Sequence, residues 1–80
     1  MARYDFEIIG ELVAVETIAR GTGVRIRHFL NQTYGRGDWR KRKGIALVRY
    51  EDGRMARAEV HWFEAHGIGR VLQKVIREIG

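Results

Sequence analysis

The sequence contains neither cysteine nor proline among its 80 residues. Without cysteine there can be no disulfide framework and no cysteine-based zinc site, so a hydrophobic core or an oligomer must supply the stability. Long apolar runs are lacking as well, so we expect neither a transmembrane helix nor a signal peptide, but a cytoplasmic protein without membrane contact. At this length we expect one small domain over residues 1–80, with a modest core.

Acidic residues are scarce in the middle of the chain. Residues 20–49 carry nine basic side chains and one acidic side chain, a net charge of +8, whereas residues 1–19 have a net charge of −3. Most of the basic residues in the chain are arginine, whose planar guanidinium group suits phosphate and stacks on bases. The first hypothesis is therefore an anionic partner, and the alternative is an arginine-rich face that is simply solvated.

The first half of the chain predicts a strand followed by a helix. Apolar and charged residues alternate over residues 4–9, and apolar residues resume at residues 12–18 after Gly10, so we expect one long strand bulged at the glycine or two short strands. Residues 24–34 place apolar side chains at helical spacing, with Gly35 as a C-terminal cap, which predicts an amphipathic helix. Residues 35–44 are expected to form an exposed connection.

The second half contains the strongest local signal for a hairpin. Asp52-Gly53 separates two runs rich in β-forming residues, which is typical of a two-residue turn, and such a turn pairs Glu51 with Arg54. This register predicts a face that packs on the helix residues Phe29 and Leu30 and comprises Ile45, Leu47, Ala56, Ala58, Val60 and Trp62. The opposite, mixed face comprises Tyr50, Met55, Arg57, Glu59, His61 and Phe63.

These elements predict an α+β fold. We expect one amphipathic helix packed on a four- to five-stranded antiparallel sheet with a central Asp-Gly hairpin. The spacing of apolar residues over residues 70–79 fits either a helix or a last strand, and the pattern alone does not decide between them.

The densest run of charge predicts a contact with nucleic acid. Cationic side chains neutralise phosphates, and an exposed tryptophan can stack on an unpaired base. The candidate residues are Arg36, Trp39, Arg40, Lys41, Arg42 and Lys43. In the alternative interpretation, Trp39 folds back onto the core and the charges face water.

A second candidate site lies on the second strand of the hairpin. Arg57, Glu59 and His61 alternate, so their side chains emerge on one face. A ribonuclease that cleaves through the 2′-hydroxyl needs a general base, a general acid and a cation near the phosphorane, which are roles that Glu, His and Arg can fill. The alternative is a row of salt bridges on an exposed sheet face.

Metal binding is not expected from the histidines. His61, Glu64 and His66 have no helical metal-ligand spacing, and on a strand His61 points away from the other two. His28, on the predicted helix, is more typical of a surface residue than of a ligand. We therefore expect no metal and no other cofactor.

One stretch of the chain carries a recognisable motif. The run AEVHWFEAHGIGR at residues 58–70 is its specific part, and looser matches are WRK at 39–41, KGIA at 43–46, VR at 48–49 and DG at 52–53. With these residues, the stretch 34–70 resembles a group of small uncharacterised bacterial proteins that are frequent in cyanobacteria. The resemblance implies no activity, but it favours a strand for the end of the chain.

These patterns lead to one function and two alternatives. The leading hypothesis is a small basic nucleic-acid-binding module, with RNA ahead of DNA, that uses the segment from Arg36 to Lys43. The layout of a helix followed by a hairpin is similar to small ribonuclease toxins of the barnase and RelE type, so the first alternative is a ribonuclease using Glu59, His61 and Arg57. The second is a protein-interaction module with an acidic partner. Assembly into a homo-oligomer is left open.

Overall fold

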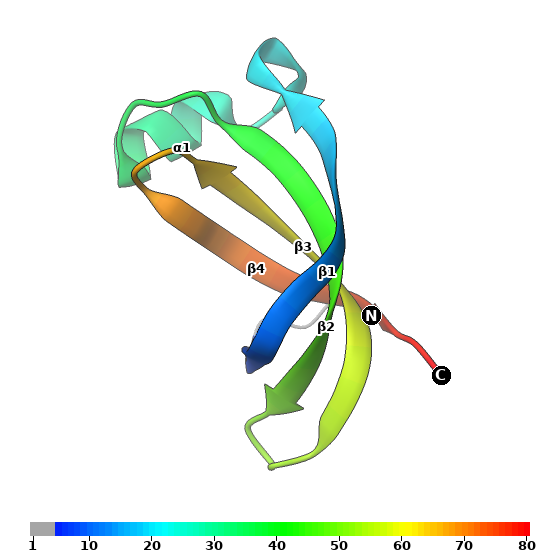
Figure 1. Cartoon of the computed structure of the whole chain (residues 1–80). Helices are drawn as coiled ribbons and strands as arrows, with labels where there is room; N and C mark the ends of the chain where they lie inside the picture. The colour runs from blue at the N-terminus through cyan, green and yellow to red at the C-terminus, as the bar shows by residue number, and fades with distance from the viewer. Residues whose placement is uncertain (1–4) are drawn as a thin grey trace.

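In the computed structural model, which describes residues 5–80, the chain forms a four-stranded antiparallel sheet with one α-helix at its end (Figure 1). The strands lie in the sheet in chain order, and they are β1 (Phe6–Arg20), β2 (Arg40–Tyr50), β3 (Met55–Ala65) and β4 (Gly69–Glu78). The connection from β1 to β2 contains the 3-10 helix η1 (Gly21–Gly23) and the helix α1 (Arg27–Tyr34). The predicted α+β class, with one helix and an antiparallel sheet, is confirmed, and the sheet has four strands.

The two edge strands settle two open points of the sequence pattern. β1 is one long strand, and Gly10, with φ +78°, lies where its pairing with β2 shifts between Ile9 and Val13. Tyr4, which the alternation also assigned to this strand, lies outside the described residues. The end of the chain is strand β4, which pairs with β3. Neither helix in residues 5–80 has the length and apolar character needed to cross a bilayer.

The register between β2 and β3 differs from the predicted one by one residue. Tyr50 N–H donates to the Arg54 carbonyl, and Gly53 N–H donates to the Tyr50 carbonyl, so the loop contains Glu51, Asp52 and Gly53. Gly53 has φ +89° and therefore follows the turn as the left-handed residue of a bulge, whereas a two-residue turn would place it at the centre. Arg49 consequently pairs with Met55 instead of with Ala56.

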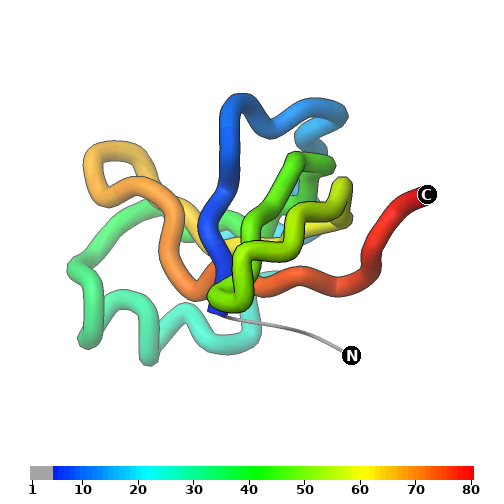
Figure 2. The backbone as a smooth tube through the Cα atoms, turned by 90° about the horizontal axis from the view of Figure 1, so that it is seen from below, coloured from blue at the N-terminus to red at the C-terminus, as the bar shows by residue number. Residues whose placement is uncertain are grey.

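The main core lies on the face of the sheet that this register creates. Its buried residues are Val48, Tyr50, Ala58, Val60, Trp62 and Val75. Phe6, Ile8 and Leu12 of β1 pack against the same cluster as Val75 of β4, so both edge strands reach it. The sheet therefore curls around this core, as the perpendicular view also shows (Figure 2).

A second core lies on the opposite face of β3, under the helix. Leu30, the buried residue of α1, packs with Trp39, Val24 and Ala65. Ala65 belongs to the odd-numbered residues of β3, which point away from Val60 and Trp62 because strand side chains alternate. A helix as short as α1 is marginal in water by itself, so these contacts hold it in place.

The one-residue shift explains which predicted core residues are wrong. On β3, Ala58, Val60 and Trp62 are buried as predicted, but Leu47 of β2 is 36% exposed and Ile45 is only half-buried. Their neighbours Ala46, Val48 and Tyr50 take their places in the core. The prediction that Phe29 and Leu30 pack on the face of Val60 and Trp62 is also wrong. Phe29 is 50% exposed, and Leu30 belongs to the second core on the opposite face.

Neighbouring residues of β2 offer a test of this register. We expect Val48→Ala to lower the free energy of unfolding by about 2 kcal/mol, because Val48 is fully buried. Leu47→Ala removes more atoms but is expected to cost less than about 1 kcal/mol, because Leu47 is partly in water. Urea denaturation measures both values, and a larger loss for Leu47→Ala would contradict the observed register.

Candidate nucleic-acid interface

The run Arg40 to Lys43 belongs to the central strand β2 and not to an exposed connection, so the prediction for residues 40–44 is wrong. Strand alternation divides these side chains between the two faces of the sheet. Arg40 and Arg42 lie on one face, where both approach Glu64, with Arg42 Nη1 3.3 Å from Glu64 Oε2. The four cations therefore do not form one continuous contact surface.

The two lysines of this run point to the opposite face and have partners there. Lys43 Nζ lies 3.6 Å from Glu16 Oε2, and Lys41 Nζ lies 5.8 Å from the centre of the Phe63 ring. All the cations of the predicted segment except Arg36 are thus engaged within the protein. The pairing of β2 with both of its neighbours causes this, because it places a glutamate of β1 or β3 beside each of Arg40, Arg42 and Lys43.

Trp39 is fully buried, so it provides no surface for stacking on a base, and this role is corrected. Its indole N–H donates to the Gly35 carbonyl over 3.1 Å, and the centroids of its ring and of the Tyr34 ring lie 6.1 Å apart. Gly37 is required next to it, because a Cβ there would lie 2.9 Å from Cβ of Ala65. The tight loop turns Trp39 inward and leaves Arg36 and Asp38 exposed.

The uncompensated positive charge lies instead at the end of the molecule that carries α1. Within residues 5–80, no carboxylate forms an ion pair with the arginines of this end, which are Arg20, Arg25, Arg27 and Arg36. They lie at the end of β1, just before and at the start of α1, and just after it (Figure 1). We call these four residues the basic end.

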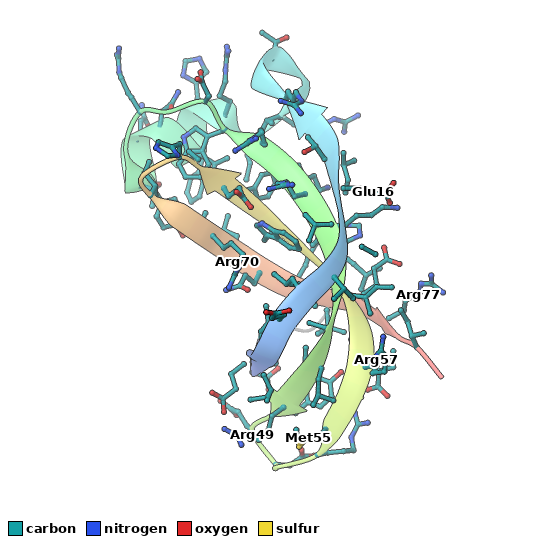
Figure 3. The ribbon with its side chains drawn as sticks, viewed as in Figure 1. Glu16, Arg49, Met55, Arg57, Arg70 and Arg77 are labelled. Carbon is teal, nitrogen blue, oxygen red and sulfur yellow. The ribbon has the colours of Figure 1, made fainter. Side chains whose placement is uncertain are left out.

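The rest of the sheet neutralises most of its own charge. Arg49 forms an ion pair with Glu7. Arg54 Nη2 lies 2.7 Å from Glu78 Oε2, and Arg77 Nε lies 2.9 Å from Glu59 Oε1. Arg57 and Arg70 are exposed cations of the strands without such a partner among the described residues, and they lie apart from each other (Figure 3). The basic end is therefore where unpaired arginines gather.

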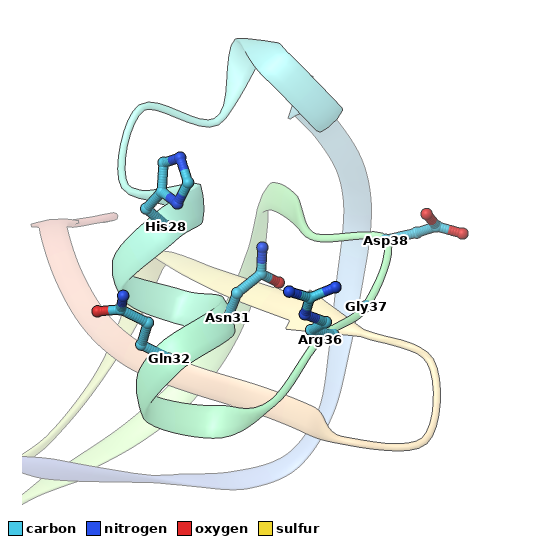
Figure 4. A pocket seen from close by; sticks show the side chains of 6 residues that line it. All are labelled: His28, Asn31, Gln32, Arg36, Gly37 and Asp38. Atoms are coloured by element: carbon cyan, nitrogen blue, oxygen red, sulfur yellow. The ribbon is translucent and has the colours of Figure 1, made fainter.

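Two pockets open at the basic end. One is lined by three polar residues of α1 and by the loop that follows it, namely His28, Asn31, Gln32, Arg36, Gly37 and Asp38 (Figure 4). The other is lined by Arg20, Gly21, Asp38, Trp39, Arg40 and His66. Asp38 lines both, so the two pockets adjoin on either side of the loop.

The structure brings together two of the three residues predicted for ribonuclease chemistry. His61 Nε2 lies 2.6 Å from Glu59 Oε2, but the arginine on this carboxylate is Arg77, which donates from Nε to Oε1 over 2.9 Å. Arg57 stays exposed, and no ion pair joins it to Glu59. Arg77 carries no sequence signal for this role, because the pairing of β4 with β3 alone brings it to Glu59.

The environment of Glu59 is that of a structural carboxylate. The hydrogen bonds from His61 and Arg77 hold the pKa of Glu59 below its usual value of 4.5, and burial opposes this only weakly. A general base works best with a pKa near the working pH and a free lone pair. Both oxygens of Glu59 are engaged, so the arrangement favours the row of salt bridges over the catalytic interpretation.

Glu64 holds the other face of the sheet together in a similar way. Its Oε1 accepts a hydrogen bond from the Trp62 indole N–H over 2.6 Å, and Arg42 approaches its Oε2. Burial raises the pKa of Glu64, but the Trp62 hydrogen bond and the Arg42 charge lower it more, so it lies below 4.5. His61 and Glu64 belong to different faces, and residues 5–80 contain no cluster of side chains suited to a metal ion.

Sequence reasoning missed Arg20, Arg25 and Arg27, although they belong to the segment with the net charge of +8. The prediction instead used the run Arg40 to Lys43, where the positive charge is densest along the chain. A usable signal was that Arg25 and Arg27 lie outside the strongly β-forming runs, where no neighbouring strand can supply a carboxylate. Arg20, at the end of β1, pairs with Arg40, which is itself a cation.

Comparison of the chain with protein-family models, curated protein sequences and solved structures finds no match.

The charge of Glu64 is expected to stabilise the fold in a pH-dependent way. Glu64→Gln keeps an acceptor for Trp62 but removes the charge beside Arg42, and should lower the free energy of unfolding by about 1 to 2 kcal/mol at neutral pH. Because the folded-state pKa is lowered, this stabilisation is complete above pH 4.5 and is lost as the pH falls through the folded-state value.

Urea denaturation of the wild type and of Glu64→Gln over a range of pH measures this difference. The two proteins should converge in acid. An equal gap at neutral and strongly acidic pH would show that the packing of the side chain matters, and that its charge does not.

Proposed function

We propose that this protein is a small nucleic-acid-binding module, with RNA ahead of DNA, and that the basic end is its contact surface. The observation that supports this is the gathering of Arg20, Arg25, Arg27 and Arg36 at one end without carboxylate partners among the described residues. Guanidinium groups bind phosphates in a bidentate manner and release counterions from the nucleic acid on contact. The surface differs from the linear segment that the sequence indicated, and Arg36 belongs to both.

The arrangement of charge favours this function over the alternatives. Elsewhere on the sheet, glutamates neutralise most of the cations, so a polyanion is attracted to one end of the molecule and not to its whole surface. RNA is placed ahead of DNA because proteins recognise RNA mainly through unpaired regions, which can enter small pockets such as those beside α1. A toxin-type ribonuclease and a module for an acidic protein remain as outcomes of the test.

Charge-removing variants at the basic end provide that test. If the four arginines contact phosphates, the logarithm of the affinity for a single strand should fall with the logarithm of salt concentration with a slope near −3, from about 0.7 counterion released per contact. Arg36→Gln and Arg25→Gln should each flatten the slope by about 0.7. Fluorescence anisotropy with labelled RNA, over a series of salt concentrations, measures the slope.

Arg57→Gln is the matched control, because it removes the same charge from an exposed, unpaired arginine on β3, away from α1 (Figure 3). It should leave the slope unchanged. Equal effects of Arg57→Gln and Arg36→Gln would show that only the net charge matters and would contradict the assigned surface. Shortened RNA on a gel would favour the ribonuclease, and the absence of binding to RNA and DNA would favour the acidic protein partner.

A further inference from the structure

The pocket beside α1 has the chemistry of a base-binding site. His28, Asn31 and Gln32 lie on one side of the helix, because residues three and four apart share a helix face, and Arg36 closes the pocket from the loop (Figure 4). The walls thus carry two carboxamides, an imidazole and a guanidinium group.

One of these amides has an unmet hydrogen-bond requirement. Asn31 Oδ1 is shielded from water and has no hydrogen-bond partner in the protein. A shielded acceptor without a partner destabilises the protein, so a ligand that supplies a donor to it is favoured. Asn31 lines the pocket, and the soft χ2 angle of asparagine allows a ligand to reorient its amide.

We propose that this pocket holds one unpaired nucleobase, so that the ligand of the basic end is single-stranded nucleic acid. The inference rests on the proposed function and adds what the pocket recognises. Carboxamides pair in a bidentate manner with the edge of a base, and planar imidazole and guanidinium groups stack on its face. A base that is paired within a duplex has its Watson–Crick edge paired and both faces stacked, so it cannot enter such a pocket without leaving the stack.

The second pocket supplies a place for the neighbouring phosphate. It adjoins the first at Asp38 and contains Arg20, His66 and the outer part of Arg40. The distance from Arg40 Nη2 to Glu64 Oε2 is 3.9 Å, which is long for an ion pair, so Glu64 holds this guanidinium group weakly. A strand that places a base beside Asn31 therefore meets Arg20 and Arg40 in the second pocket, where these two cations outnumber the carboxylate of Asp38.

The test compares strands that share phosphates but differ in their bases. Fluorescence anisotropy of the full chain is measured with a single-stranded RNA of about ten nucleotides, with the same strand carrying abasic sugars throughout, and with a duplex. We expect the normal strand to bind about tenfold more tightly than the abasic strand or the duplex. Asn31→Leu should weaken binding of the normal strand about tenfold and leave binding of the abasic strand unchanged.

Gln32→Leu provides a second variant at an exposed position, should Asn31→Leu fail to fold, and Thr33→Leu is the control on the same helix outside the pocket. Thr33→Leu should not change either affinity. Equal binding of normal and abasic strands, or equal weakening of both by Gln32→Leu, overturns the base pocket while the proposed function stands. The absence of binding to any strand overturns the proposed function itself.

Discussion

The backbone hydrogen bond from Tyr50 to Arg54 closes the hairpin of β2 and β3, and the place of every side chain on the two central strands depends on it. It sets a loop that ends in Gly53 with a positive φ, a combination that suits the right-handed twist of the strands. Because strand side chains alternate, this single choice puts Val48 and Tyr50 on the same face as Val60 and Trp62. A sheet with one apolar face can then curl and enclose it between its two edge strands.

The same register decides the electrostatics of the molecule. It brings Arg42 and Arg40 to Glu64 of β3 on one face. On the other face, the pairing of β2 with β1 brings Lys43 to its ion-pair partner Glu16. Most of the glutamates of the sheet are consumed in such pairs. Arg25, Arg27 and Arg36 lie in the connection from β1 to β2, outside the ladders, and have no strand neighbour to supply a carboxylate. Arg20, at the end of β1, has the cation Arg40 as its strand neighbour, so it also remains uncompensated.

Buried contacts hold the basic end in place, although it consists mainly of loops and one short helix. Trp39 and Leu30 anchor the connection to the end of the sheet, and the close approach of Gly37 to Ala65 leaves no room for a side chain there. With alternate residues of this loop turned inward, Arg36 and Asp38 are directed outward. Trp39 was expected to contact nucleic acid directly. In the structure it is buried, and its burial holds the loop that presents Arg36 at the basic end.

The sequence by itself determined the kind and order of the elements as far as β3, and the sign of the charge, but left the last element open between a helix and a strand. Alternation over β1 and β3, the turn signal at Asp52-Gly53 and the helical spacing before Gly35 are local properties of neighbouring residues, and they identified the strands, the hairpin region and the helix. They also predicted that Ala58, Val60 and Trp62 of β3 are buried. These features follow from backbone and side-chain preferences within a few positions of the chain.

Only the tertiary structure decided which cations are free and which residues meet. A one-residue difference in a turn costs little locally but exchanges the two faces of β2, so Leu47 became exposed and Tyr50 buried. The partners of Arg42 and Glu59 come from other strands, and pairing between strands distant in sequence has no local signature. For this reason the run Arg40 to Lys43 forms part of strand β2 and has partners within the sheet. The arginines around α1, which are spread along the sequence, form the basic end.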